Sequence, residues 1–426
     1  SITDYGSFNQ NTTLALSANE EIDVLACVGF PYATGIQQGY LSDLEENDLI
    51  QTYGQGIIDA VGQENVDACR VNGVLYGLPS NRDIAQGRGC AAIATEYLDG
   101  IGYEANTDDE IVKISLDELN DIYAQLHEKY PDKEVYRPTT GSMSQFSNVD
   151  SLGGNVFGVL LDYGQNLDVV NLFESDFYKD YCARLYDYNQ KGYISADAST
   201  DTTAVGELVK AGTLMSYTTG GKPGIKAQET TLTGRDMTIF QTLDDYISST
   251  SVASMPWTIP ISAQHKEAAM KFLNECYTNA DIANLLAWGI EGTHYKIGDD
   301  GLATYADGVD ASNSGWNHSM GWMMPNQFLT HVWEGNDPDL WTEMKEFNTN
   351  AKVSKASGFS FDSTNVANEL TAVQNVYNEY QTSVEYGFVD PETGIAEMND
   401  KMMTAGLQKI IDEKKAQLAA WQEANK

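Results

Sequence analysis

The chain has 426 residues, 42% of them hydrophobic, with 62 Asp and Glu against 25 Lys and Arg. The formal net charge of −37 repels nucleic-acid phosphates and anionic lipid headgroups, so it excludes a nucleic-acid partner and favours a monomer. The length exceeds what one hydrophobic core usually serves, and two or three packed domains are therefore expected. No apolar run approaches the roughly 18 residues that a membrane-spanning helix needs.

The first third of the sequence predicts helices and strands in alternation. Apolar spacing predicts a helix over 9–19, and the apolar run 21–28 predicts a strand that is buried on both faces. The acidic segment 40–49 is expected to be helical. Asn72 and Gly73 lie between apolar residues and predict a hairpin turn.

The remaining two thirds continue this pattern. Ser115, with Glu118 three residues later, predicts a capped helix over 116–130. Aromatic residues at helical spacing predict a helix over 176–190 that turns its rings toward a core. The further predicted elements are two helices at 263–277 and 281–288, a hairpin turn at 299–301 and one long amphipathic helix over 398–425. Alternating strands and helices are typical of α/β folds.

Residue types that carry common catalytic chemistry are scattered through the chain. The cysteines form no CxxC pair, and they are Cys27, Cys69, Cys90, Cys182 and Cys276. The histidines show neither HxH nor HxxxH spacing, and they are His127, His265, His294, His318 and His331. This spacing argues against zinc, and the acidic residues at 299–301 lack the remaining ligands of a calcium loop. The GxSxG and GxxxxGK[ST] motifs are also missing, so we expect no catalytic residues, no metal and no cofactor.

Aromatic residues supply the positive signal. The chain has 24 Tyr, 13 Phe and 7 Trp, and several of them lie in loops beside amides and small residues, at 4–10, 255–260 and 315–322. A sugar presents C–H faces that stack on aromatic rings and hydroxyls that need paired hydrogen bonds. A carbohydrate site therefore combines flat rings with Asn, Gln, Asp and Arg. The composition thus favours a carbohydrate ligand.

A series of short motifs runs through the chain in a consistent order. The motifs are EIDVL at 21–25, YLSDL at 40–44, VNGVLYGLP at 71–79, KGYI at 191–194, VKAGTLM at 209–215, WTIPIS at 257–262 and KEAAMKFL at 266–273. In these motifs the sequence resembles the extracellular solute-binding proteins of bacterial ABC importers, the group that includes the maltose-binding protein. Segments 284–295 and 321–328 resemble a lipoprotein-type subfamily whose ligands are mostly saccharides.

The resemblance implies a periplasmic-binding-protein-like α/β fold of two lobes with a hinge and a ligand cleft between them. The N-terminal lobe is expected to contain 1–107 and 256–330, and the C-terminal lobe 108–255 and 331–426. The implied function is that of an extracellular or periplasmic substrate-binding component, not an enzyme. Such a component captures an oligosaccharide by hinge closure and delivers it to the transmembrane subunits of an ABC permease.

Members of this family open with a signal peptide, a lipobox cysteine and a strand–helix unit of the first lobe. None of these features precedes Ser1. We therefore expect the natural protein to have several tens of further residues and a lipid anchor, and the missing unit to contribute ligand contacts.

Candidate ligand-binding residues are aromatic or polar side chains in loops where the resemblance places the ligand. From the N-terminal lobe and the hinge they are Tyr5, Asn9, Phe30, Tyr32, Asn81, Arg82, Asp83, Trp257, Trp316 and Trp322. From the C-terminal lobe they are Phe146, Tyr217, Phe359 and Phe361. Because Arg82 is the only basic residue among them, an anionic solute is less favoured than a neutral one.

Three other functions stay open at the level of sequence. A secreted glycan-degrading enzyme would share the acidic, aromatic-rich composition, since many pairs of the 62 acidic residues could supply two facing carboxylates. A binding protein for a peptide or another polar solute would share the fold. A surface adhesin or scaffold would show no response to small ligands.

Overall fold

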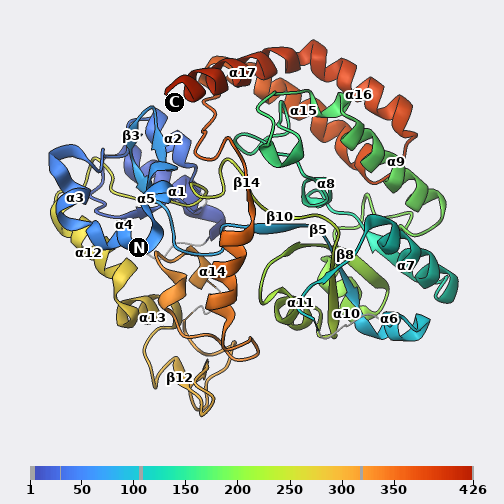
Figure 1. The fold of residues 1–426 in the computed structure, drawn as a ribbon, viewed down its shortest axis with the longest axis horizontal. Coiled ribbons are helices and arrows are strands. Elements are labelled where there is room, and N and C mark those ends of the chain that lie inside the picture. Colours follow the sequence, from blue (N-terminus) through green and yellow to red (C-terminus); the bar gives the residue numbers. More distant parts are fainter. Residues whose placement is uncertain (1–4, 29, 105–108, 317–319, 425–426) are drawn as a thin grey trace. The chain divides into compact units, whose positions relative to one another are not determined.

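The computed structural model describes residues 5–28, 30–104, 109–316 and 320–424. The chain forms two compact units (Figure 1). Unit 1 comprises Ser1–Ile84, Ser249–Lys345 and Ser357–Ser360, and unit 2 comprises Ala85–Ser248, Glu346–Ala356 and Phe361–Lys426. Each unit is therefore assembled from segments that lie far apart in the sequence.

A three-stranded antiparallel sheet joins three distant segments of unit 1. β11 (Trp257–Thr258) lies between β1 (Leu25–Ala26) and β4 (Gly77–Leu78), with Trp257 directly opposite Leu78. Apolar side chains pack beside β1 into a buried cluster of Leu16, Leu25, Cys27, Phe30, Tyr32 and Leu41.

Short helices surround this sheet, and two hairpins complete unit 1. The helices are α1 (Tyr5–Ser17), α2 (Tyr32–Gln37), α3 (Leu49–Tyr53), α4 (Gln55–Val61), α5 (Gln63–Asp67), α12 (Lys266–Thr278) and α13 (Ala280–Trp288), with 3₁₀ turns η1 (Glu46–Asp48), η4 (Gly321–Met323) and η5 (Gln327–Leu329). The hairpins are β2 (Arg70–Val71) with β3 (Val74–Leu75), and β12 (Tyr295–Ile297) with β13 (Ala303–Tyr305). In Figure 1 the yellow α12 packs on the blue α3 and α4. α14 (Leu340–Asn350) begins in unit 1 and ends in unit 2.

A seven-stranded mixed sheet forms the core of unit 2. Its central strand β5 (Gln86–Ala94) pairs antiparallel with β8, β9 and β10, and residues 90–94 are fully buried. The path of the sheet is β14–β10–β5–β8–β7, while β9 pairs with β5 and carries β6 at its other edge. The other strands are β6 (Val112–Lys113), β7 (Glu134–Arg137), β8 (Leu214–Gly221), β9 (Met237–Gln241), β10 (Asp245–Ile247) and β14 (Lys352–Val353).

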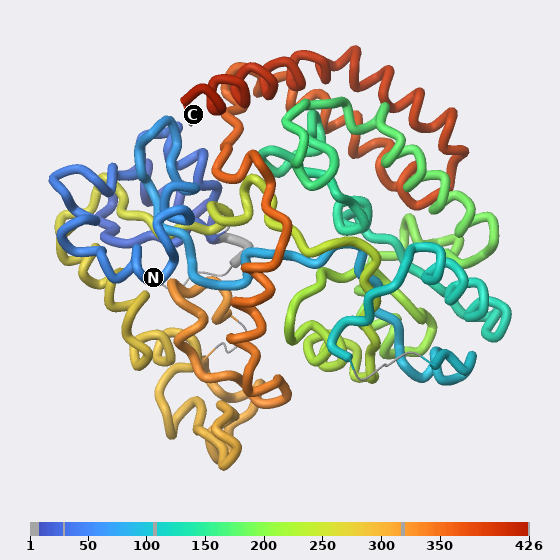
Figure 2. Tube along the Cα trace, viewed as in Figure 1, coloured from blue at the N-terminus to red at the C-terminus, as the bar shows by residue number. Residues whose placement is uncertain are grey.

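Helices flank this sheet, and those at the C-terminus of the chain pack on α9. The helices of unit 2 are α6 (Thr95–Ile101), α7 (Leu116–Lys129), α8 (Ser142–Gln145), α9 (Asp176–Gln190), α10 (Val205–Ala211), α11 (Ile225–Thr233), α15 (Ala367–Glu385), α16 (Pro391–Ala405) and α17 (Leu407–Ala424), with 3₁₀ turns η2 (Asp162–Gly164), η3 (Leu172–Glu174) and η6 (Thr364–Val366). In Figure 2 the red trace of α15 and α16 lies beside the green trace of α9, and these helices are in contact. Among the described residues, no helix combines the length and the apolar character needed to cross a bilayer.

Several local predictions are confirmed. Asn72 and Gly73 form the turn between β2 and β3, with φ of 53° and 82° as a two-residue hairpin turn requires. Ser115 caps α7, because its hydroxyl accepts a hydrogen bond from the backbone N–H of Glu118 at 3.1 Å. The Glu118 side chain is engaged elsewhere than at the cap, because its carboxylate accepts a hydrogen bond from the Tyr103 hydroxyl at 3.0 Å. The predicted helix over 176–190 coincides with α9.

Three predictions were wrong in extent. The acidic segment 40–49 is mostly irregular, with a bridge from Leu41 to Pro260 and the 3₁₀ turn η1, and α3 starts at its last residue. The strand predicted over 21–28 is reduced to β1. The long C-terminal helix divides into α16 and α17 at Gly406, whose φ of 114° no helical residue adopts.

The boundaries of the two units differ from those expected of the lobes. Residues 85–107 lie in unit 2, because β5 pairs with β8 and β9 rather than with the strands of unit 1. Residues 249–255 and 331–345 lie in unit 1. The assignment of residues 85–107 to unit 2 depends on strand pairing between segments more than a hundred residues apart. Such pairing cannot be predicted from the local sequence pattern.

Candidate ligand-binding site

Two predicted site residues of unit 1, Phe30 and Tyr32, lie in its core. Phe30 is 1% exposed, and both rings belong to the buried cluster beside β1. The Tyr32 hydroxyl donates a hydrogen bond to the backbone oxygen of Cys69 at 2.7 Å. Both rings therefore contribute to the core of unit 1 in this structure, and their predicted contact with a ligand stays a prediction. Phe359, expected in the C-terminal lobe, lies in unit 1 and is 2% exposed.

The predicted stacking rings of unit 2 are buried as well. Tyr217, on β8, donates a hydrogen bond to the buried Glu229 carboxylate, and burial raises the pKa of its hydroxyl. Phe146 lines a cavity of about 10 Å³, which is room for one water and not for a sugar ring. Phe361 is buried beneath the Lys414 ammonium, which lies 5.3 Å from the centre of its ring.

Of the two residues proposed from the N-terminal segment, only Asn9 has a side chain within the described part of the structure. Tyr5 begins α1, and its side chain lies outside the described part of the chain. Asn9 is exposed on the same helix, where its backbone oxygen accepts a hydrogen bond from the Thr13 hydroxyl at 2.8 Å. This bond lies within α1 and involves only the backbone of Asn9, so the ligand contact expected of its side chain stays a prediction.

The other predicted residues of unit 1 are drawn together along the segment that follows β4. Asn81 forms a parallel bridge with Asn326, and its Nδ2 donates to the backbone oxygen of Ala60 at 3.1 Å. The Arg82 guanidinium donates to the Asp83 carboxylate at 3.3 Å and to the Ser254 hydroxyl at 2.9 Å. The pairing of β4 with β11 places Trp257 beside the start of the same segment.

Two buried polar atoms on this surface make no hydrogen bond to any described residue. One is the indole Nε1 of Trp257, a donor, and the other is Oε1 of Gln327, an acceptor. The backbone N–H of Gln327 donates to Asn81 at 3.0 Å, and Trp257 is opposite Leu78. Leu78 and Asn81 are three residues apart in the chain, so their Cα atoms are at most about 10 Å apart. Trp257 and Gln327, which lie beside them, are therefore on the same part of unit 1. Unpaired buried polar atoms are uncommon in folded proteins. These two flank the 78–81 segment from opposite ends, and the segment is therefore our candidate binding surface.

We call this surface the unit 1 strip, and it consists of Asn81, Arg82, Asp83, Ser254, Trp257, Trp322 and Gln327. Trp322 is half-buried in η4, which adjoins η5, the turn that Gln327 begins. Ser254 and Gln327 were not predicted, because Ser254 has no distinguishing sequence signal and Gln327 is one of several polar or aromatic residues in the family-like segment 321–328.

Trp316 is not part of the strip and lies against the C-terminal end of α13. Its indole Nε1 donates to the backbone oxygen of Ala287 at 3.3 Å, and its ring stacks on His294 with centroids 5.9 Å apart. Gly321, at the start of η4, also lies against Ala287. Trp316 and Trp322 therefore both flank the end of α13.

The charges around the strip are mostly negative. The ranges of unit 1 contain six Lys and Arg against 24 Asp and Glu. Arg82 is the basic residue of the strip, and it lies against the Asp83 carboxylate. Within the described ranges, no group of three or more His, Cys, Asp and Glu side chains could hold a metal ion.

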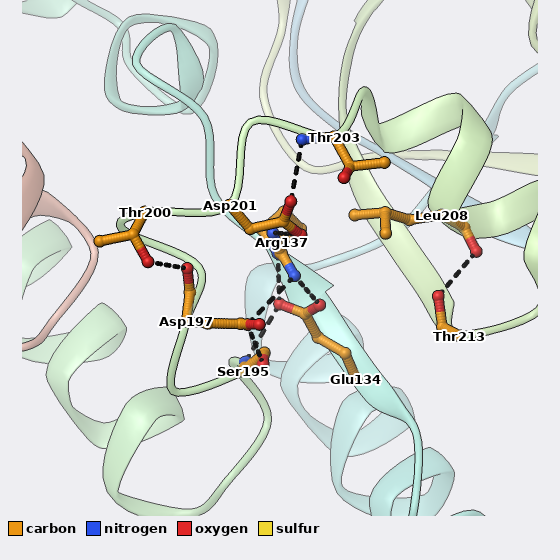
Figure 3. A network of polar contacts seen from close by, with 9 residues as sticks. All are labelled: Glu134, Arg137, Ser195, Asp197, Thr200, Asp201, Thr203, Leu208 and Thr213. Carbon is orange, nitrogen blue, oxygen red and sulfur yellow. Dashed lines mark hydrogen bonds and ion pairs between the residues drawn. The ribbon is translucent and has the colours of Figure 1, made fainter.

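The densest carboxylate cluster in Figure 3 lies in unit 2 and is closed on itself. Arg137 is 7% exposed and forms two hydrogen bonds of 2.6 Å with Glu134 and one of 3.0 Å with Asp201. The Ser195 backbone N–H donates to Glu134 at 3.1 Å. Hydrogen bonds from Thr203 and the charge of Arg137 lower the pKa of Asp201 to about 2. Because both carboxylates are engaged by one guanidinium and by neighbouring hydrogen-bond donors, this cluster is unsuited to the acid and base roles of a glycosidase.

Comparison with known proteins places this geometry in context. Residues 355–423 match a family model described as "Domain of unknown function (DUF3502)". A carbohydrate ABC transporter substrate-binding protein of Streptococcus pneumoniae is 25% identical over 97% of this chain and 82% of its own length.

Solved structures show the same fold. The N-glycan transport solute-binding protein NgtS of S. pneumoniae superposes with a TM-score of 0.84 at 23% identity, over 99% of this chain and 91% of NgtS. NgtS structures with Man1GlcNAc and with Man5GlcNAc superpose with TM-scores of 0.74 and 0.71. An HMO-binding solute-binding protein of Bifidobacterium longum infantis reaches 0.62 at 16% identity, over 98% of this chain and 91% of that protein. Together, these comparisons confirm the predicted resemblance: the chain is similar in sequence to a carbohydrate ABC transporter substrate-binding protein, and it shares the fold of solved solute-binding proteins.

Proposed function

We propose that this chain captures a neutral oligosaccharide outside the cell and hands it to the membrane subunits of an ABC importer. The observation that carries the ligand class is the unit 1 strip. In this strip, the indole N–H of Trp257 and the amide oxygen of Gln327 lie near the two ends of the 78–81 segment, and both are unpaired. The strip also contains the rings of Trp257 and Trp322. A sugar hydroxyl both donates and accepts, so it satisfies either atom, while its ring covers an aromatic face.

The names of the similar proteins support the same ligand class. The pneumococcal relative that aligns with 97% of the chain is a carbohydrate binder of an ABC transporter, and NgtS has been seen with mannose–N-acetylglucosamine glycans. Both are one-fourth or less identical to this chain, so the identity of the sugar does not carry over with the fold.

Charge favours a neutral glycan over an anionic one. A unit with 24 acidic and six basic residues repels uronic and sialic acids at long range. At the strip, the guanidinium of Arg82 is engaged by Asp83 and Ser254 rather than presented alone. A carboxylate on the sugar would have to displace these contacts.

Delivery rather than turnover is the proposed outcome of binding. The chain passes between the units at five points, after residues 84, 248, 345, 356 and 360, which suits a hinge. Ligand would stabilise a closed form by as much as it binds that form more tightly than the open one. The proposed partners are the transmembrane subunits of an ABC permease, with this chain acting as a monomer, extracellular and lipid-anchored or periplasmic.

A thermal-shift panel tests the proposal. The purified chain is heated with neutral oligosaccharides, with uronate and sialylated glycans, and with peptides and amino acids. A ligand at 100 times its Kd adds about 2.7 kcal/mol, which for a protein of this size raises Tm by roughly 2–4 °C. Chromatography of the incubated glycan checks for cleavage.

The outcomes separate the alternatives. A rise in Tm with one class of neutral oligosaccharide, without cleavage, is the expected result. A response to peptides alone would assign a different solute, and a cleaved glycan would show an enzyme. A panel without any response would point to a scaffold or adhesin and overturn the proposal.

A further inference from the structure

Trp316 is the most exposed of the seven tryptophans, at 38%. Its exposure is unusual because the residue is also held in place from several directions. His294 stacks on its ring at an interplanar angle of 27°, and its indole N–H is bound to the backbone oxygen of Ala287. The exposed surface is therefore what remains of the ring once one face and the N–H edge are occupied.

The backbone around Trp316 fixes the ring further. The Ser314 hydroxyl donates to the backbone oxygen of Trp316 at 2.6 Å. The Nδ1 of His294 accepts a hydrogen bond from the N–H of Ile290 at 2.8 Å, which orients the imidazole under the indole. We call the stacked pair of Trp316 and His294 the platform.

A glycine makes room for the platform. Gly289 ends α13 with φ of 84°, and a Cβ at this position would lie 2.4 Å from Nδ1 of His294 and 3.1 Å from Cγ of Trp316. No other residue fits there without displacing the stack. The arrangement is that of an exposed ring kept rigid, which binds a flat partner with little loss of side-chain entropy.

The platform and η4, which carries Trp322 of the strip, both contact the C-terminal end of α13. Trp316 binds the backbone of Ala287, against which Gly321 also packs, and Trp322 of the strip follows Gly321 directly. The strip supplies hydrogen-bonding atoms as well as rings, whereas the platform presents an aromatic surface. A ligand that reaches both must be longer than one that the strip holds alone.

We propose that the platform is a second sugar subsite, which stacks on the outer residues of an oligosaccharide whose inner residues bind the strip. The inference rests on the proposed function, and it adds that this protein selects glycans by length. An exposed indole is suited to the apolar C–H face of a pyranose, and such a contact tolerates different sugars because it reads shape rather than hydroxyl positions.

Calorimetric titration of Trp316→Ala tests the proposal. The probes are mannose–N-acetylglucosamine glycans and other neutral oligosaccharides, each as a disaccharide and as a chain of five or more residues. We expect Trp316→Ala to weaken binding of the long glycans about 10-fold, as for one stacking contact, and binding of the disaccharides less than 2-fold. Trp316→Tyr keeps a ring and should restore most of the affinity for long glycans. Phe272→Ala is the control, because Phe272 is an exposed ring on α12, at 49%, and belongs to neither the strip nor the platform.

His294→Ala addresses the platform without removing its exposed ring. This variant should weaken binding of the long glycans only, and by less than Trp316→Ala does, because the indole keeps its exposed face but loses the ring that stacks on it. Equal losses for short and long glycans, or no loss in Trp316→Ala, would overturn the platform proposal while leaving sugar binding intact. If the unsubstituted protein bound no glycan of any length, the proposed function and the platform would fall together. A melting temperature measured without ligand shows whether a variant has lost its fold.

Discussion

Arg137 in unit 2 and Trp257 in unit 1 are both polar side chains largely shielded from solvent, but their surroundings differ. Arg137 directs its guanidinium to two carboxylates within 3.0 Å, and its partners are held in turn by Ser195 and Thr203. The Trp257 indole N–H is buried without a partner among the described residues. A satisfied polar group stabilises the fold, whereas an unsatisfied buried one costs stability, and we take the Trp257 N–H as a candidate contact for a ligand. Substitutions at the two kinds of site should therefore separate stability from binding.

The largest effect on stability is expected for Arg137→Leu. It leaves the nearly buried Glu134 carboxylate without its counter-charge, and the free energy of unfolding should fall by about 3 kcal/mol. Urea denaturation followed by circular dichroism measures the change. The control is Arg235→Leu, whose partner Glu96 is 54% exposed, and which should lose less than about 1 kcal/mol. Equal losses in the two variants would contradict a closed, buried network at Arg137.

A second closed network predicts a loss of about 2 kcal/mol in Lys414→Met. The Lys414 ammonium is fully buried and donates to the backbone oxygens of Ser151 at 2.9 Å and Gly158 at 2.8 Å, and to Oδ1 of Asn155 at 3.0 Å. A methionine fills the space but leaves these oxygens unpaired. Lys415→Met, on the exposed side of the same helix, should change the unfolding free energy by less than 0.5 kcal/mol, within the usual range of surface substitutions. Glycan affinity should be unchanged in both.

Trp257→Phe is expected to have the opposite effect to the preceding variants, with weaker glycan binding and no loss of stability. It keeps a ring and removes the unpaired N–H, so glycan binding should weaken about 10-fold while the unfolding free energy stays the same or rises by up to about 1 kcal/mol. Trp341→Phe is the matched control, because the N–H of Trp341 donates to the Thr330 oxygen at 2.7 Å. It should lower stability by about 1 kcal/mol and leave binding unchanged. A stability loss in Trp257→Phe without a change in affinity would remove Trp257 from the site.

The contrast also explains how much of the molecule could be predicted from sequence. Elements that depend on neighbouring residues were predictable, such as the Ser115 cap and the turn at Asn72 and Gly73. The family motifs predicted an α/β fold that the solved relatives share. The pairing of β5 with β8 and β9 was not predictable, because it joins segments more than a hundred residues apart.

The candidate site was harder to predict than the fold, because burial is not a local property. Phe30 and Trp257 both follow apolar segments in loop-rich sequence, yet Phe30 is 1% exposed in a core and Trp257 is only half-buried. Gln327 and His294 lie in the family-like segments 321–328 and 284–295, yet nothing in those segments singles out either residue. What distinguishes them is an unpaired oxygen in one case and a stacked indole in the other, and both arise only when distant segments meet.

The smallest expected effect concerns the pH dependence of the Arg137 network. Hydrogen bonds from Thr203 and the charge of Arg137 lower the pKa of Asp201 to about 2, from an ordinary value of 3.8. A carboxyl whose pKa is lower in the folded state contributes stability above its ordinary pKa, and this contribution is lost as the pH falls from about 4 toward 2. Asp201→Asn should therefore have a lower Tm than the parent at pH 6, with a difference that shrinks below pH 4. Asp307→Asn, which removes an exposed carboxylate paired with Lys296, should show a smaller difference at every pH. A Tm difference for Asp201→Asn that stayed constant down to pH 3 would mean that the hydrogen bonds of Asp201, and not its charge, hold the 195–203 segment.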